Sequence, residues 1–320
     1  MRGNKMKAVI CTKYGSPDVL KLTEVEKPAP KDNEVCIKIH ATAVTASDIF
    51  IRSSELPIQF LIPMRLMMGL TKPRKSIIGL VLAGEIESVG KNIKRFKTGD
   101  KVYGITGFGL GAYAEYKCMK ETDSTYGCLA LKPTNLTYEE ATTAIYGGLL
   151  ALQYIEKGNI QRGQKVLIYG ASGTSGTIAV QIAKYLGAEV TGVCSTYNLE
   201  MVKSLGSDKV IDYTKGDSIN LIEKYDFILD SVGKIKSSKF KIECRKALST
   251  NGKYISIDDG ALELQSERLV KLKELIEAGH IKPIIDRIYP LEQIVEAHEY
   301  VGKGHKKGGV AITVVNNKKI

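Results

Sequence analysis

The sequence predicts an α/β protein in which a β-rich domain accompanies a doubly wound parallel sheet. Three observations predict this class. Residues 165–176 read KVLIYGASGTSG, an apolar strand that breaks into glycines and leads into a helical pattern. Strand and helix patterns then alternate as far as residue 257, whereas the region before residue 90 holds short apolar or alternating runs. A chain of 320 residues also suits two domains that share a cleft.

The early strands predict the β-rich domain. They are expected over residues 6–11, 20–25, 34–41 and 78–89. Pro28, Pro30, Gly90 and Gly99 punctuate these runs, as turn residues do between short strands. The pattern is typical of a domain that is partly barrel-like.

The glycines at 170, 173 and 176 predict a phosphate cradle for a dinucleotide. A buried parallel strand must turn sharply into a helix while leaving the first N–H groups of that helix facing an anion. A side chain at 173 would keep the backbone away from a pyrophosphate, and one at 176 would hold the helix off the strand. A plain strand-to-helix turn is the alternative. The following helix favours the cradle, with apolar residues at 178, 179, 182, 183 and 186.

The next strand, residues 188–194, predicts which dinucleotide binds. It leads to Ser195 and Thr196, where an NAD-binding chain would place Asp or Glu on the adenosine ribose. Ser195, Thr196 and Asn198 can instead donate hydrogen bonds to a 2′-phosphate. We therefore expect NADPH to bind at least about tenfold more tightly than NADH, a gap of roughly 1.4 kcal/mol.

The alternation then continues towards the end of the sheet. We expect helices over 199–205 and 219–224 and strands over 209–213, 227–230 and 253–257. Ligands of such sheets lie at the carboxyl ends of the strands. Residues 230–233 and 256–260, which include Val232, Gly233 and Asp258, should therefore face the nicotinamide half of the cofactor.

Composition excludes several classes of protein. No stretch approaches the roughly 20 apolar residues that span a bilayer, and no signal peptide is evident, so we expect a cytoplasmic protein with no membrane partner. The net charge is +11, but Lys and Arg are interleaved with Asp and Glu along the chain, which argues against a nucleic-acid partner. The six cysteines form no C-x-x-C pair and are expected to be reduced core residues, and the four histidines to be surface or capping residues.

Several motifs together resemble the zinc-independent branch of the medium-chain dehydrogenase/reductase superfamily, the quinone oxidoreductases related to zeta-crystallin. The stretches that carry the resemblance are residues 6–10, 14–20, 43–48, 51–53, 79–84, 89–90, 96–104, 111–116, 171–176, 290–298 and 304–308. The resemblance implies a GroES-like catalytic domain, residues 1–124 and 263–320, around an inserted Rossmann NADP-binding domain, residues 125–262. A helix over 267–278 and a strand over 310–315 would rejoin the first domain. The resemblance also implies a homodimer.

The positions that hold zinc in the metal-dependent branch lack ligands here. Thr45 stands for the first cysteine, Leu80 and Val81 stand for His-Glu, and residues 144–149 contain no cysteine. Because Leu and Val donate nothing to zinc, we expect no metal. Hydride transfer from NADPH to a quinone or an α,β-unsaturated carbonyl suits such a site. The alternatives are a zinc-type alcohol dehydrogenase-like enzyme, or a non-enzymatic NADPH- or RNA-binding protein of the kind found among zeta-crystallin relatives.

The resemblance assigns roles to individual residues. Thr45, Asp48 and Tyr146 are the candidate catalytic residues, although Thr45 and Asp48 could merely cap a strand and Tyr146 could be a packing residue. Phe50 replaces an aromatic hydroxyl of the family and cannot donate a proton. The candidate cofactor-binding residues are Gly147, Gly170, Ala171, Ser172, Gly173, Thr174, Ser175, Gly176, Ser195, Thr196, Asn198, Tyr213, Val232, Gly233 and Asp258.

The Met-rich segment 56–70 suggests a permissive substrate pocket. Phe50, Phe60, Met64 and Met67 are its candidate lining residues. Ordinary packing between domains is the alternative reading of this segment.

Overall fold

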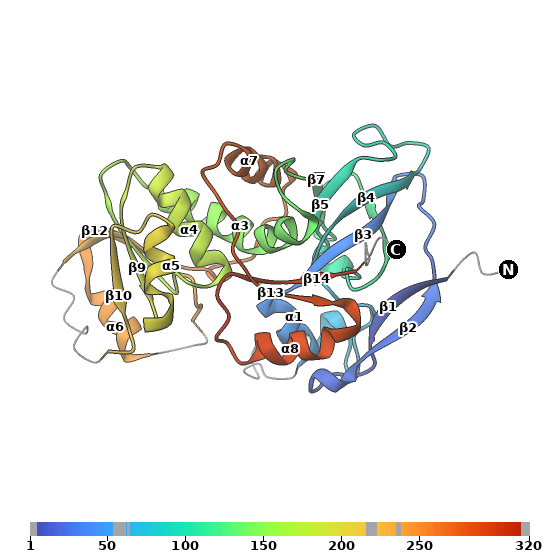
Figure 1. Cartoon of the computed structure of the whole chain (residues 1–320), viewed down its shortest axis with the longest axis horizontal. Helices are drawn as coiled ribbons and strands as arrows, with labels where there is room; N and C mark the ends of the chain where they lie inside the picture. The colour runs from blue at the N-terminus through green and yellow to red at the C-terminus, as the bar shows by residue number, and fades with distance from the viewer. Residues whose placement is uncertain (1–4, 54–61, 63–64, 216–222, 235–237, 315–320) are drawn as a thin grey trace. The chain divides into compact units, whose positions relative to one another are not determined.

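The computed structural model describes residues 5–53, 62, 65–215, 223–234 and 238–314, which fold as two compact units (Figure 1). The first unit comprises residues 1–145, 264–270 and 285–320, and the second comprises 146–263 and 271–284. We expected the inserted domain to begin at residue 125. In the structure the division falls inside helix α3 (Tyr138–Gly158).

The packing of α3 explains this later boundary. At its start, Thr142 Oγ1 donates to the carbonyl of Thr42 in the first unit at 3.1 Å. Further along, a Cβ on Gly158 would lie 2.6 Å from the Phe227 ring in the second unit. One continuous helix therefore contributes to both cores.

The first unit is built on a mostly antiparallel sheet. Its strand order is β13-β14-β3-β4-β5-β7, with β6 paired to β3, and a separate ribbon joins β1 to β2. Strand β13 runs parallel to β14. The bounds are β1 Lys5–Cys11, β2 Leu20–Glu26, β3 Glu34–Val44, β4 Val81–Val89, β5 Lys101–Ile105, β6 Tyr116–Lys120, β7 Cys128–Leu131, β13 Ile285–Pro290 and β14 Gly309–Thr313.

One face of this sheet forms an apolar core. Val35, Ile37 and Ile39 alternate along β3 and are fully buried with Leu82 and Leu129. Helices α1 (Ala46–Arg52) and α8 (Ile294–Gly302) pack against each other in the same unit. The unit is the GroES-like fold that the early strands and the chain ends predict.

The second unit is a parallel sheet of five strands among the described residues. Its order is β10-β9-β8-β11-β12, so the chain moves outward from β8 and then crosses back to β11 on the other side. The bounds are β8 Lys165–Tyr169, β9 Glu189–Cys194, β10 Lys209–Asp212, β11 Tyr225–Asp230 and β12 Leu248–Ser256. Strand β12 begins earlier than the sequence pattern indicated, and most of the helix expected over 219–224 falls outside the described residues.

Helices cover both faces of the parallel sheet. Helix α6 (Lys239–Lys246) packs on the face that carries Leu167 and Val193. Helices α4 (Thr174–Tyr185) and α5 (Leu199–Ser204) cover the other face, where a Cβ on Gly192 would lie 2.4 Å from Val202. This is the doubly wound Rossmann-type arrangement, and it places the reversal of strand order between β8 and β11.

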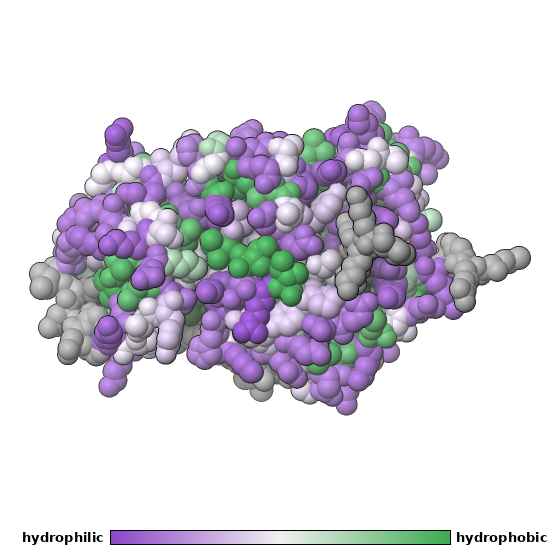
Figure 2. Space-filling view, in the orientation of Figure 1, coloured by the Kyte–Doolittle hydropathy of each residue, from purple (hydrophilic) through white to green (hydrophobic). Residues whose placement is uncertain are grey.

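The face shown in Figure 2 is largely hydrophilic, with apolar residues in separate patches, in keeping with the mixed charges of the sequence. None of the helices in the described part of the chain has the length and apolar character that a membrane span requires.

Candidate functional site

The glycine turn lies where β8 ends, beside the end of β11. Gly170 has φ +80°, a conformation that favours glycine. A Cβ there would lie 2.6 Å from Val232. At Gly176 a Cβ would lie only 2.1 Å from the carbonyl oxygen of Gly170, so this glycine lets α4 approach the strand. Both glycines are therefore required by packing within the turn.

Gly173 differs from these two glycines. Its φ of −75° is open to any residue, and it occupies the N-cap position of α4. The nearest atom to a Cβ at Gly173 would be the Gly170 oxygen, at 3.4 Å. Protein packing alone thus does not demand a glycine here. A close approach of a bound anion to the backbone gives a physical reason for it.

The rest of the turn suits a phosphate. The Ala171 side chain is fully buried and its N–H donates to the Val193 carbonyl at 2.9 Å, which fixes the turn to β9. Ser172 and Thr174 are partly exposed, whereas Ser175 is buried in the first turn of α4. The first N–H groups of a helix have no partner within the helix, and its dipole favours negative charge there. The cradle fits the diphosphate of a dinucleotide.

An acidic residue lies at the adenosine end, at a place that sequence inspection missed. Thr196 Oγ1 donates to Asp212 Oδ2. Thr214 donates to Asp212 Oδ1 through its N–H at 2.9 Å and its hydroxyl at 2.6 Å. Burial opposes these hydrogen bonds, but the pKa of Asp212 is lowered from its usual value and the carboxyl stays ionised. The end of β10 thus supplies the carboxylate that is absent from residues 195 and 196.

Ser195 and Asn198 form a small pair beside Asp212. Asn198 Nδ2 donates to Ser195 Oγ at 3.1 Å, so the proton of Ser195 points elsewhere. Asn198 itself is buried, whereas Tyr213 is 46% exposed directly after β10. Of the residues expected to donate to a 2′-phosphate, Thr196 already donates to Asp212, and Asn198 donates to Ser195.

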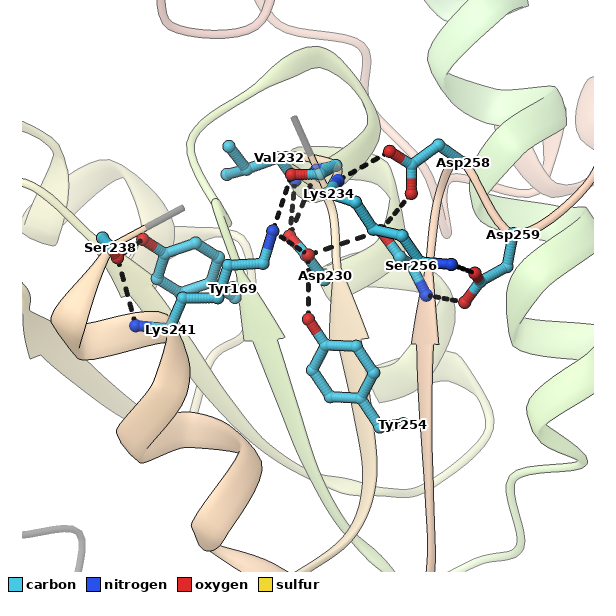
Figure 3. Close-up of polar contacts among 11 residues, drawn as sticks. Tyr169, Asp230, Val232, Lys234, Ser238, Lys241, Tyr254, Ser256, Asp258 and Asp259 are labelled. Carbon is cyan, nitrogen blue, oxygen red and sulfur yellow. Dashed lines mark hydrogen bonds and ion pairs between the residues drawn. The ribbon is translucent and has the colours of Figure 1, made fainter. Parts of the chain in front are cut away.

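Asp230 organises the loop at the carboxyl end of β11 (Figure 3). Its carboxylate is fully buried, and Oδ1 accepts from the N–H groups of Val232 at 3.0 Å and Gly233 at 3.2 Å. Its Oδ2 accepts from Tyr254 at 2.9 Å and lies 3.3 Å from the Ser256 hydroxyl. Sequence inspection expected this loop at the nicotinamide half, and Asp230 is the residue that holds the loop in shape.

Lys241 balances the buried charge of Asp230. Its ammonium lies 2.5 Å from Asp230 Oδ2, and it also donates to the Gly233 carbonyl at 2.6 Å. Helix α6 thereby anchors both ends of the turn. Removal of either partner of this buried ion pair should destabilise the protein, because the other charge would stay buried without compensation.

Asp258, two residues after the end of β12, supports the same loop. Its Oδ1 accepts from Ser256 at 2.6 Å, and its Oδ2 accepts from the N–H of Lys234 at 2.6 Å. A Cβ on Gly233, where φ is +88°, would lie 3.1 Å from Asp258 Oδ2. Asp258 therefore positions the backbone of the loop.

Tyr146, Gly147 and Gly148 lie on α3. A Cβ on Gly147 would lie 2.6 Å from the Thr174 carbonyl, and one on Gly148 would lie 2.5 Å from Leu272. The glycines thus let α3 approach its neighbours within the second unit, a packing role in addition to any cofactor contact. Tyr146 is partly exposed beside them.

Thr45 and Asp48 hold each other in the first unit. Thr45 donates to Asp48 Oδ2 through its N–H at 2.8 Å and its hydroxyl at 2.7 Å, which forms a capping box at the start of α1. Asp48 is fully buried, and this burial raises its pKa to about 7. The Asp48 carboxyl faces Thr45, which suits a positioning role, and direct catalytic contact by Asp48 stays a prediction. The two residues do form a cap, at the start of helix α1 rather than on a strand.

A buried polar chain continues from α1 to α8. Arg52 Nε donates to His298 Nδ1 at 3.3 Å, and His298 Nε2 lies 3.1 Å from the Tyr113 hydroxyl. Burial, with the Arg52 charge, lowers the pKa of His298 to about 3. The expectation that His298 is a surface or capping residue is wrong, because the fold encloses its ring completely. His40 stacks on Tyr138 with ring centroids 4.4 Å apart.

The proposed substrate pocket is only partly described. Phe50 is half-buried on α1, and Met67 is 50% exposed. Phe60 and Met64 lie outside the described residues. The pocket stays a prediction.

The positions that the metal-dependent branch uses for zinc hold no ligands. Leu80 and Val81 are buried at the start of β4, and Thr45 is committed to the capping box. Within the described ranges, no three His, Cys, Asp or Glu side chains come together as a metal site would require.

Comparisons with known proteins match this architecture. Residues 31–128 match the alcohol dehydrogenase GroES-like domain, and residues 176–275 and 258–312 match zinc-binding dehydrogenase families. The tomato (Solanum lycopersicum) 2-methylene-furan-3-one reductase is 32% identical over 97% of this chain and 79% of its own. The chloroplastic NADPH-dependent alkenal/one oxidoreductase of Arabidopsis thaliana is 29% identical over 96% of this chain and 79% of its own. The quinone oxidoreductase of Coxiella burnetii superimposes with a TM-score of 0.81 at 25% identity, covering 97% of this chain and all of that one.

The fold and the glycine turn define a nicotinamide-dependent oxidoreductase. The chain belongs to the medium-chain dehydrogenase/reductase superfamily, in its zinc-independent quinone oxidoreductase branch. The sequence motifs had indicated this family, and the comparisons confirm it.

Proposed function

We propose that this protein reduces quinones or α,β-unsaturated carbonyl compounds with NADPH. The main support for this proposal is Gly173, which lies at the N-cap of α4, where packing within the turn does not require a glycine. It supports a bound diphosphate. The names of the relatives, an enone reductase, an alkenal/one oxidoreductase and a quinone oxidoreductase, support the acceptor class.

The chain's own residues would share the work of binding and orientation. A bound nicotinamide supplies the hydride. The glycine turn and the start of α4 would hold the diphosphate, and the loop fixed by Asp230 would present its backbone to the nicotinamide half. Thr45 is our candidate for a hydrogen bond to the acceptor. Its hydroxyl donates to Asp48 Oδ2 here, so it would have to turn its proton from Asp48 to the acceptor.

The donor set argues against a zinc-dependent mechanism. Leu80 and Val81 offer no nitrogen, sulfur or carboxylate ligand. An acceptor that is already electrophilic needs positioning and preorganised dipoles rather than a Lewis acid. Quinones and enones meet that requirement, whereas simple alcohols do not.

NADPH is the cofactor we propose, and the Ser195 hydroxyl supports it. Asp212 opposes a 2′-phosphate because of its charge and because it engages Thr196. We expect the preference for NADPH over NADH to persist but to be limited by this carboxylate. Equal affinities for the two would contradict the proposal.

Oxidation of NADPH in the presence of a panel of quinones, enones, aldehydes and alcohols tests the proposed function. We expect turnover with quinones or enones, and we expect Gly173→Val to abolish cofactor binding while the protein stays folded. Alcohol oxidation with stoichiometric zinc would select the dehydrogenase alternative. RNA binding that weakens steeply with salt, without turnover, would select the non-enzymatic one.

We further propose a homodimer located in the cytoplasm. The homodimer rests on the family resemblance. Some relatives carry mitochondrial or chloroplastic names. Sedimentation of the purified protein and fractionation of the source cells would test the two statements separately.

A further inference from the structure

Two cysteines that are distant in the sequence face each other across neighbouring strands. Cys36 on β3 is paired in register with Cys118 on β6. In the same ladder, the N–H of Ile39 donates to the Glu115 carbonyl at 2.8 Å, which marks that pair as hydrogen-bonded. Hydrogen-bonded and non-hydrogen-bonded pairs alternate along antiparallel strands, so Cys36 and Cys118 form a non-hydrogen-bonded pair.

This position suits a disulfide. The Cα atoms of a non-hydrogen-bonded antiparallel pair lie about 4.5 Å apart, and their side chains approach more closely than in the other kind of pair. Disulfides span Cα separations of about 4.4–6.8 Å. With the backbone of β3 and β6 in this position, small rotations of the two side chains would bring the sulfurs within bonding distance.

The pair lies on the sheet face opposite the apolar core. Val35, Ile37 and Met119, three of the four neighbours of the two cysteines along their strands, point into that core. Cys36 is 1% exposed, whereas Cys118 is partly exposed. One thiol is thus accessible, and the other is sheltered directly beside it.

The two thiols also influence each other's ionisation. A hydrogen bond between them is the largest influence on both, and it lowers the pKa of Cys36 and raises that of Cys118. The Lys27 ammonium adds to the lowering at Cys36. The thiol that loses its proton more readily is therefore Cys36, the sheltered member of the pair.

Cys118 opens onto a basic groove of about 440 Å³. Arg74, Lys75 and Lys117 line the groove together with Cys118, and Glu26 is its acidic lining residue. A smaller cavity of about 230 Å³, also lined by Lys75 and Lys117, reaches Cys118 as well. The groove therefore favours a small anionic molecule over a neutral one.

We propose that Cys36 and Cys118 form a redox-active dithiol that exchanges with small disulfides bearing carboxylate groups, of the oxidised glutathione type. The Cys36 thiolate accepts the proton of Cys118 as the Cys118 sulfur attacks one sulfur of the external disulfide, which forms a mixed disulfide and releases one thiolate. Cys36 then attacks the Cys118 sulfur, closes the intramolecular disulfide and releases the second thiolate. The chain loses two electrons and two protons, and the external disulfide becomes two thiols.

Oxidised glutathione added to the full-length protein tests this proposal. After alkylation of the remaining thiols, intact mass and peptide mapping should show one disulfide that links Cys36 to Cys118, with the other four cysteines alkylated. Dithiothreitol should reverse it. Cys36→Ser should instead accumulate the mixed disulfide on Cys118, because the resolving thiol is missing. Cys118→Ser should form neither the mixed disulfide nor the intramolecular one.

Cys128→Ser is the matched control, since Cys128 is buried in the same unit and should leave the disulfide unchanged. A wild-type protein whose Cys36 and Cys118 both remain alkylatable would overturn the proposal. So would a link between a different pair of cysteines, or a mixed disulfide that persists on wild-type Cys118. The wild-type map decides the matter even if a serine variant fails to fold.

Discussion

The Thr196 hydroxyl donates its proton to the Asp212 carboxylate, which lies at the end of the neighbouring strand β10. A hydroxyl has one proton, so Thr196 can only accept a hydrogen bond from a ligand while this contact lasts. A ribose hydroxyl can provide such a bond, and a phosphate cannot. We therefore expect Asp212 to limit any preference of the adenosine end for NADPH.

Asp212→Asn should increase the ratio of NADPH to NADH affinity by about tenfold, or about 1.4 kcal/mol. The change removes the charge that repels a 2′-phosphate and lets Thr196 turn its proton towards it. Titration of each cofactor by calorimetry measures the ratio. Glu200→Gln, on the exposed first turn of α5, is the control. An unchanged ratio in Asp212→Asn would show that the carboxylate does not reach the cofactor.

Substitutions of Gly173 and Gly176 should affect different properties, cofactor affinity for Gly173 and stability for Gly176. Gly176→Ala should destabilise the protein by about 1–3 kcal/mol, because its Cβ would lie 2.1 Å from the Gly170 oxygen. Gly173→Ala should leave the melting temperature unchanged and weaken cofactor binding at least about tenfold. Thermal unfolding and cofactor titration of both variants check this. Normal cofactor affinity in a folded Gly173→Ala protein would count against the cradle.

Lys241→Met should destabilise the protein by about 3–5 kcal/mol, because it leaves the Asp230 carboxylate buried without its partner. Urea unfolding measures the change. Lys246→Met is the control, since the Lys246 pair with Glu243 is exposed and should contribute little. Equal effects of the two substitutions would contradict the importance of the buried pair.

Asp48 and His298 should give opposing pH dependences. Burial raises the pKa of Asp48 to about 7, so its stabilising contribution is complete below about pH 4 and disappears as the pH rises through about 7. Burial lowers the pKa of His298 to about 3, so its contribution is present above about pH 6.5 and is lost as the pH falls towards about 3.

Between about pH 4 and 6.5 the two dependences should largely cancel, each being at most about 1.4 kcal/mol per pH unit. In Asp48→Asn the free energy of unfolding should rise with pH over this interval, and in His298→Gln it should fall. Denaturant unfolding at several pH values measures both slopes. The same slope in the two variants would rule out this assignment.

Local sequence patterns were sufficient for the glycine turn and the alternation of strands and helices. The reason is that Gly170 needs a positive φ and Gly176 a close approach, requirements that few other residues meet. The loss of zinc ligands could likewise be read directly from Leu80 and Val81. Motif order over most of the chain identified the family.

Contacts between distant segments could not be predicted in this way. The sequence alone determined the fold class, the glycine turn and the family, because each rests on the chemistry of nearby residues. Only the tertiary structure decided that Asp212 stands beside Thr196, that His298 is enclosed between Arg52 and Tyr113, and that Cys36 meets Cys118. Strand order and register set these neighbours, and no local pattern in the sequence encodes them.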